Sequence, residues 1–192
     1  MSGTYPTTPV FSAVNFQSEY FNLSSQTISG RMQVRNIGGQ RFSFSASYPP
    51  MTRSEFQPVM AFIMSQRGMA ETFSIVLPEV SDASGTVAGA MAADGAGAIG
   101  DTSIDVNGIS GVLKAGDVFK FAGHNKVYMA TADRSGPGTL SFQPALISSV
   151  SDNEVMAYDN VPFTVRLAND VQEFSVATDL SYRYEVDFVE AI

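Results

Sequence analysis

The sequence predicts a mainly β fold, in which a split β-sandwich or barrel carries one flanking α-helix and an inserted small β-module. Three observations predict it. Apolar and polar residues alternate in several segments, most cleanly over residues 182–188, and a period of two puts each set on one face of a strand. Only residues 54–68 show convincing helical spacing. A tract rich in Ala and Gly, residues 83–100, separates segments with alternating patterns.

The first predicted strands lie at residues 32–34 and 42–48, where apolar and polar residues alternate. The intervening Asn-Ile-Gly-Gly at residues 36–39 predicts a hairpin turn, because Gly tolerates a positive φ. Two prolines at residues 49–50 end the second strand.

One α-helix follows. Ser54, with Gln57 three residues later, predicts the N-cap. Pro58 is tolerated only in the first turn, so we expect the helix to begin at residues 55–58. Gly68 is a natural residue just beyond its C-terminal end. The apolar face contains Val59, Phe62 and Ile63.

Further strands are predicted on both sides of a central region. Residues 73–77 alternate before Pro78, and residues 163–168 and 182–188 alternate near the C-terminal end. Between them, short strand patterns and a turn signal indicate a β-module of about 60 residues. Those shorter patterns are at residues 118–121, 126–131 and 139–143, and the turn is at residues 134–138.

These patterns predict a split domain. Strands from residues 1–82 are expected to pair with strands from residues 161–192, and residues 83–160 form the insertion. The tract at residues 83–100 holds 7 Ala and 5 Gly among 18 residues, which is too little side chain for a packed core. We expect it to be an arm that packs against a neighbouring subunit.

Composition excludes several functions. The chain has 192 residues, is 44% hydrophobic and carries a net charge of −8, with residues 1–82 neutral and residues 83–160 and 161–192 each at −4. Sequence-specific binding of nucleic acid needs a basic face, so we do not expect it. The absence of Cys excludes disulfides and thiolate metal sites.

No targeting segment is expected. Residues 1–6 have no basic region followed by an apolar run, so they do not predict a signal peptide. No window approaches 18 consecutive apolar residues, so we expect no membrane span. Synthesis in a cytoplasm is therefore expected.

Residues 95–100 match the dinucleotide-binding pattern G-x-G-x-x-G. That motif binds pyrophosphate only between a strand and a helix. Here a run of small residues precedes it and a strand pattern follows, so we interpret the match as a by-product of composition and expect no cofactor.

A catalytic triad or a His-based metal site would have to use His124, the single histidine. Because His124 lies in a tight turn signal, we expect a polar turn residue. Two carboxylate pairs could hold Ca²⁺, but neither belongs to a D-x-D-x-D-G loop, so solvated loops are the simpler expectation. These pairs are Asp101 with Asp105 and Asp152 with Glu154, while Asp179, Glu185, Asp187 and Glu190 are expected as charges on strand surfaces.

Two further patterns carry little functional information. Asn22 begins a formal glycosylation sequon, which has no weight without a secretory signal. Met60, Met64 and Met69 suit core or interface packing. Phe-rich strands could instead form a groove for a glycan, although the absence of Trp makes a sugar-stacking platform less favourable.

Strand patterns near the C-terminal end include residues 163–170, 173–174 and 184–190. The early order is two strands, a helix ending in Gln-Arg-Gly at 66–68, and a strand at 73–77. In these features the chain resembles tail-tube and distal-tail proteins of tailed bacteriophages. The central region is similar to small β-modules of phage virion proteins at residues 114–119, 122–123 and 139–142.

This resemblance implies a structural virion protein that is made in the host cytoplasm and resides in the tail. It implies self-assembly, commonly of six copies, into a ring around the channel through which DNA passes, and contact with other tail proteins. The long tract at residues 83–100 departs from simple tube proteins and favours an adaptor or distal ring.

Two other functions stay open. One is a module that binds host-surface glycans, and the other is a hydrolase that uses carboxylates. Nothing in the sequence nominates a catalytic, cofactor-binding or metal-ligating residue, so the primary prediction is a protein without enzymatic activity.

Overall fold

The computed structural model describes residues 3–192. Met1 and Ser2, which belong to the segment at residues 1–6 considered for a signal peptide, lie outside the described range. Within that range the fold is mainly β with one α-helix, as predicted. The elements are β1 Ala13–Gln26, β2 Met32–Ser47, α1 Arg53–Ser65, the short 3-10 helix η1 Gly68–Ala70, β3 Phe73–Ile75, β4 Ala88–Ala93, β5 Ser103–Ser110, β6 Val112–Leu113, β7 Val118–Phe121, β8 Tyr128–Ala130, β9 Arg134–Ser135, β10 Gly138–Gln143, β11 Met156–Ala157, β12 Phe163–Leu167, β13 Phe174–Val176 and β14 Tyr182–Glu190.

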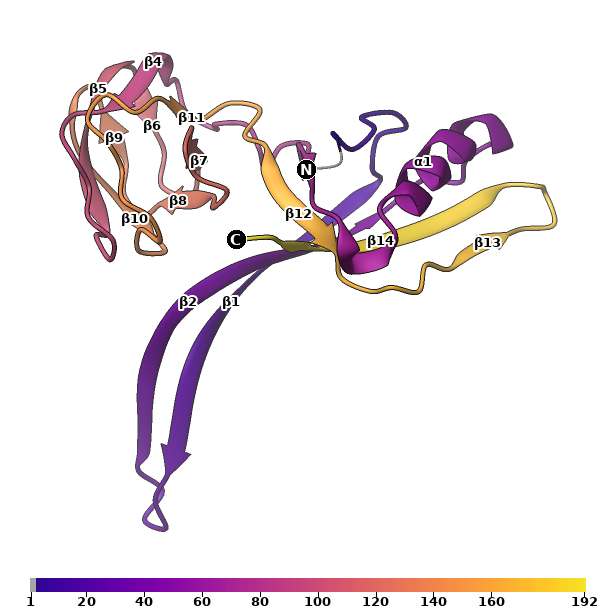
Figure 1. Cartoon of the computed structure of the whole chain (residues 1–192), viewed down its shortest axis with the longest axis horizontal. Coiled ribbons are helices and arrows are strands. Elements are labelled where there is room, and N and C mark those ends of the chain that lie inside the picture. Colours follow the sequence, from indigo (N-terminus) through magenta and orange to yellow (C-terminus); the bar gives the residue numbers. More distant parts are fainter. Residues whose placement is uncertain (1–2) are drawn as a thin grey trace.

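The first sheet combines the two ends of the chain. Its order is β1-β2-β14-β12-β3, with β13 pairing to the outer part of β14. All of these strand pairs are antiparallel. In Figure 1 the strands from both ends of the sequence cross in the middle of the molecule, and β1 and β2 continue away from it as a long curved hairpin.

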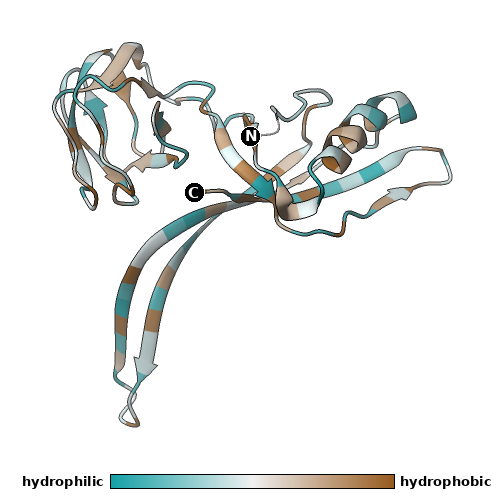
Figure 2. Cartoon of the chain, in the orientation of Figure 1, coloured by the Kyte–Doolittle hydropathy of each residue, from teal (hydrophilic) through white to brown (hydrophobic). Residues whose placement is uncertain are grey.

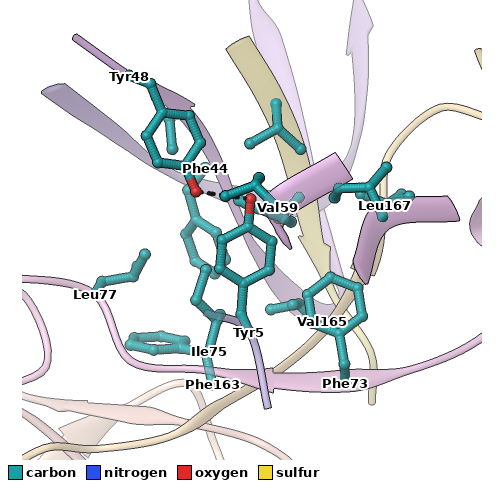
Figure 3. Packing of buried hydrophobic residues seen from close by; sticks show 14 of the residues in the cluster. Tyr5, Phe44, Tyr48, Val59, Phe73, Ile75, Leu77, Phe163, Val165 and Leu167 are labelled. Atoms are coloured by element: carbon teal, nitrogen blue, oxygen red, sulfur yellow. Dashed lines mark hydrogen bonds between the residues drawn. The ribbon is translucent and has the colours of Figure 1, made fainter. Parts of the chain in front are cut away.

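The first core lies on one face of this sheet, under α1. Alternate residues of β2, β12 and β14 are buried there, as their period of two predicted. Helix α1 adds Phe56, Val59 and Ile63. Figure 3 shows Val59, Phe73 and Ile75 beside Tyr5. The hydroxyl of Tyr5 accepts a hydrogen bond of 3.0 Å from the hydroxyl of Tyr48. Stacked and edge-on aromatic rings thus join the N-terminal segment to the sheet.

Residues 88–157 form the second sheet, in the order β11-β7-β8-β10-β5-β4. A bridge between Ala92 and Val155 brings the two edge strands together, so the sheet is nearly closed into a barrel. Its own core contains Phe119, Phe121, Tyr128 and Phe142. β6 and β9 form a separate two-stranded pair beside it.

Side chains of β7 and of the connection between β7 and β8 join the second sheet to the first. Val118 and Val127 are buried in the first core rather than the second. Lys126 is fully buried, forms an ion pair with Glu190 of β14, and donates a hydrogen bond of 2.6 Å to Gln40 of β2. Lys120 also crosses the boundary, because its amino group donates to Thr164 at 3.0 Å.

The predicted turn at residues 36–39 is wrong. β2 runs through it, and the chain reverses at residues 27–31. Gly38 and Gly39 do have positive φ, but the extra residues opposite Phe21 form a β-bulge inside the hairpin. Gly-containing sequences favour bulges as well as turns, which is why the local signal misled.

The helix also begins earlier than predicted. Its N-cap is Thr52, not Ser54, and the backbone N–H of Thr52 donates to the Glu55 carboxylate at 2.8 Å. Pro58 is thereby in the second turn, within the helix. The hydrogen bond from the Thr52 backbone N–H lowers the pKa of Glu55. At the other end Gln66 is the C-cap and Arg67 already has a left-handed backbone conformation.

The Ala/Gly tract is not a bare arm. It contains β4, which pairs with β5, and its Met91, Ala93 and Gly97 are buried in the second sheet. The expectation that such a tract cannot contribute to a core is therefore wrong. Small residues fit here because the strand backbones approach closely: a Cβ at Gly108 of β5 would lie 2.1 Å from the carbonyl oxygen of Ala90.

Candidate assembly surface

The most unusual surface of the molecule is the long hairpin of β1 and β2. Every residue from 17 to 39 is exposed, so this part of the hairpin packs only on itself. Figure 1 shows it leaving the body of the molecule, and Figure 2 shows brown, hydrophobic positions along both strands. The exposed large hydrophobic residues are Tyr20, Phe21, Leu23, Ile28, Met32, Val34 and Ile37.

Such a hairpin has the features of an interaction site. An isolated two-stranded hairpin is marginally stable in water, and contiguous exposed apolar surface marks interaction sites. Ile28 at the tip is fully exposed and Leu23 is 59% exposed. We therefore treat residues 17–39 as the candidate assembly surface and call this segment the distal hairpin.

The two edges of the first sheet differ. β3 is covered, because Thr4 bridges to Ser74 and the N–H of Tyr5 donates to the Ser74 carbonyl at 2.7 Å. β1 pairs only with β2, so the other edge of its 14-residue length is unpaired among the described strands. A long free edge is a template for pairing with another chain.

The strand register defines the two faces of the hairpin, because directly opposed residues share a face. Near the body, Phe16 opposes Phe44 on the core face, and Gln17 opposes Ser43 on the other. Beyond the bulge, Leu23 opposes Arg35. Arg31 adjoins the same face, since the N–H of Thr27 bonds to its carbonyl beyond the last strand pair. One face of the distal hairpin is therefore basic and partly apolar.

The body of the first sheet continues that outward face as a polar surface. Register places Ser43, Ser45 and Ser47 of β2 beside alternate residues of β14. Its charged residues are mixed in sign: Glu19, Glu173, Glu185 and Asp187 against Arg41, Arg166 and Arg183. The acidic excess of the chain is therefore not concentrated on this face.

The structure places His124 in a structural role. Its side chain is buried, with Nδ1 2.9 Å from the Tyr128 hydroxyl and Nε2 3.4 Å from the Ser149 carbonyl oxygen. Its ring also packs on Phe121. The turn was predicted correctly, but the burial comes from tertiary packing that a turn signal does not reveal.

The carboxylate pairs stabilise loops. Asp101 accepts the Ala98 N–H at 2.7 Å, and Asp152 accepts the Gly95 N–H at 2.8 Å. Glu154 accepts from the Gly123 N–H at 2.8 Å. Asp105 accepts a short bond from the Thr139 hydroxyl. Across residues 3–192, no group of three or more His, Cys, Asp or Glu side chains is placed to hold a metal ion.

The G-x-G-x-x-G match lies between two strands. Gly97 pairs with Val150, and β5 begins three residues after Gly100, so no helix N-terminus faces the motif. This segment packs against the second sheet. Its geometry agrees with the interpretation of the match as a by-product of composition.

Of the four carboxylates predicted on strand surfaces, Asp179 lies instead in the turn between β13 and β14, so its prediction as strand-surface charge is wrong. Asp179 accepts from the Ser181 hydroxyl at 2.6 Å, which lowers its pKa, and Glu185 accepts from the Ser45 hydroxyl at 2.9 Å. Asp187 is exposed as predicted. Glu190 is buried, so its prediction as surface charge is wrong: it bonds to the N–H groups of Phe42 and Val127 as well as to Lys126.

Two lysine side chains between the sheets have lowered pKa values. Desolvation lowers the pKa of Lys126 and of Lys120, and the charge of Glu190 opposes that shift at both. Lys126 also lies 4.4 Å from the centre of the Phe42 ring. These groups join the two sheets and do not form an accessible chemical site.

Comparison with known families identifies the central region. Residues 82–161 match the family model described as "Distal tail protein pb9, B domain". The resemblance to tailed-phage tail proteins is confirmed. The matched segment includes the whole second sheet, and the match supports a structural role in a phage tail. No curated protein matches the chain.

The described residues also contain no helix that is both long and apolar enough to cross a bilayer. The sequence analysis did not predict the distal hairpin as a site. The sequence feature that could have indicated it is the high number of large apolar residues between residues 20 and 37, all of which the structure leaves exposed.

Proposed function

We propose that the chain is a distal-tail or adaptor component that self-assembles into a ring, with six copies expected, around the DNA channel of a phage tail. The observation that carries this proposal is the distal hairpin, which exposes apolar side chains and an unpaired strand edge. The family match of residues 82–161 supports the setting in a tail.

A ring follows from the asymmetry of the hairpin contact. If the hairpin of each copy covers a different surface on the next copy, the contact is heterologous, and such contacts close into rings when the rotation permits. The role is structural rather than catalytic. Other tail proteins would contact the outer surface of this ring.

We also propose the division of the chain into a split domain, residues 1–82 plus 161–192, and an inserted domain, residues 83–160. Separate sheets and separate buried clusters support it, as does the near coincidence of the insertion with the matched segment. The inserted domain would face away from the ring axis.

The part of the polar face that lies nearest the distal hairpin, with Gln17, Ser43, Glu19 and Arg41, is the proposed lining of the channel. Polar side chains, with one cation and one carboxylate at the opposed positions Arg41 and Glu19, offer DNA neither a basic surface nor an apolar one, so the duplex would pass without being held. The protein would be made in the host cytoplasm and reside in the virion tail.

The experiment compares the chain with a variant that lacks the distal hairpin. Replacing residues 21–39 by Asn-Gly joins the Tyr20–Gln40 pair through a two-residue turn and preserves the register of the body. We expect the complete chain to form particles with a central hole in electron micrographs and the shortened chain to be a monomer.

A control variant carries Ile99→Ser and Val155→Ser, which change exposed apolar residues of the second sheet. It should assemble like the complete chain. A complete chain that stays monomeric at high concentration, or a shortened chain that still forms rings, would overturn the proposal.

A further inference from the structure

Two grooves lie at the end of the first sheet that is remote from the distal hairpin. One, of about 340 Å³, is lined by α1 and β13 and contains Arg53 and Met64. The other, of about 780 Å³, lies along β13 and β14 and contains Glu173, Glu185 and Asp187. In Figure 1, β13 and the outer part of β14 lie far from the tip of the β1–β2 hairpin, so one chain cannot bring the two together.

The charges of the second groove are distinctive. Its lining contains three carboxylates and a single cation, Arg183. Apolar surface is present too, because Val171 is 82% exposed and Phe174 is 43% exposed. We call this the acidic groove. It is a polar surface with a local apolar contact area.

The distal hairpin has the complementary character. Between residues 20 and 40 there are two cations, Arg31 and Arg35, and no carboxylate. Leu23 lies opposite Arg35 on the same face. Opposite charges on two surfaces guide their orientation and disfavour wrong pairings. The groove beside α1 carries a cation of its own, Arg53, and therefore suits a basic hairpin less well.

We propose that the basic face of the distal hairpin of one copy occupies the acidic groove of the next copy. This inference rests on the proposed self-assembly and names the receiving surface within it. The occupant is a second copy of this chain because the chain itself supplies both complementary surfaces and holds them apart.

The first test uses the absence of Cys from the chain. Gln33→Cys marks the basic face of the hairpin and Ser175→Cys marks the acidic groove, both at exposed positions. The two single-Cys variants are mixed and treated with a short bis-maleimide. We expect a cross-linked dimer containing one chain of each variant.

The matched control replaces Ser175→Cys by Ser103→Cys, an exposed position on β5. That mixture should give no cross-link above background. Cross-linking of Gln33→Cys alone would indicate a hairpin–hairpin contact and overturn the inference, as would equal cross-linking to Ser103→Cys.

The second test reverses charge. Glu173 and Asp187 are suitable because no hydrogen bond or ion pair to either side-chain carboxylate is found within residues 3–192, whereas Asp179 and Glu185 bond to neighbouring strands or turns. Glu173→Lys with Asp187→Lys should weaken assembly about tenfold, from the loss of two exposed ion pairs and new repulsion. Combining these with Arg31→Glu and Arg35→Glu should restore most of it.

The outcomes separate the two proposals. Rings of unchanged stability in the groove variant, together with monomers after removal of the hairpin, would refute the acidic groove and keep the proposed assembly. A complete chain without rings would refute both. Loss of assembly in each charge-reversed variant, with recovery in the combined variant, supports the groove.

Discussion

The buried Lys126–Glu190 ion pair gives the most quantitative prediction for stability. Lys126→Met keeps most of the apolar stem of the side chain but removes the counter-charge of Glu190, which stays buried. Glu190 retains two backbone donors, the N–H groups of Phe42 at 3.1 Å and Val127 at 3.0 Å. Those bonds limit the damage, so we expect a loss at the lower end of the range for broken buried pairs, about 3 kcal/mol.

For a chain of this size, that loss lowers the Tm by roughly 6–12 °C. The assay is thermal unfolding of the hairpin-shortened monomer by circular dichroism, which removes effects of assembly. The matched control is Lys114→Met, since Lys114 pairs with Asp133 at 2.8 Å but both side chains are about half exposed. Its loss of stability should be much smaller, because solvent screens this exposed pair. Equal losses in the two variants would refute the assignment of Lys126 as the buried tie between the sheets.

Three smaller predictions concern the helix, the second sheet and alkaline pH. Thr52→Ala should cost about 1 kcal/mol in urea unfolding because Thr52 is the N-cap, whereas Ser54→Ala should leave stability nearly unchanged; the reverse order would contradict the cap assignment. Gly108→Ala should destabilise the second sheet by more than about 2 kcal/mol, since its Cβ meets a β4 carbonyl, while Gly116→Ala, with positive φ but open space, should cost about 1 kcal/mol. Burial raises the pKa of Tyr48 to about 12, so stability should fall as pH rises from 10 toward 12, because the unfolded chain loses that proton first; Tyr48→Phe should make this dependence shallower but not remove it, since burial also raises the pKa of Tyr5, Tyr128 and Tyr184, and an unchanged slope would count against it.

Strands that face one core were predictable from sequence. β12 and β14 bury alternate residues, so their period of two is visible in the chain. β1 was not predicted, because its outer part is exposed on both faces and no burial selects one set of side chains. The bulge at Gly38 and Gly39 was read as a turn for the same reason, since no core-facing pattern runs through it.

Glu190 shows a signal that was present but unused. It follows Tyr184, Val186 and Phe188 at the same two-residue spacing, which places it on the core face. A carboxylate at that position requires a buried partner. The partner, Lys126, is 64 residues away in sequence, and only the tertiary structure brings the two together.

The distal hairpin was missed for a different reason. Apolar residues such as Leu23 and Val34 normally predict burial, and the chain alone does not bury them. Only the structure shows that the hairpin extends away from the body (Figure 1), which explains why these apolar residues are exposed. The acidic groove could not be predicted from the sequence either, because only the fold shows that the groove and the distal hairpin lie at opposite ends of the first sheet.

The central claim is that this chain is a structural part of a phage tail, located at its distal end. Immunogold labelling of intact virions, with an antibody raised against the second sheet, tests it most directly. The account predicts gold particles at the distal end of the tail. Virions without label, or label confined to the capsid, would contradict it.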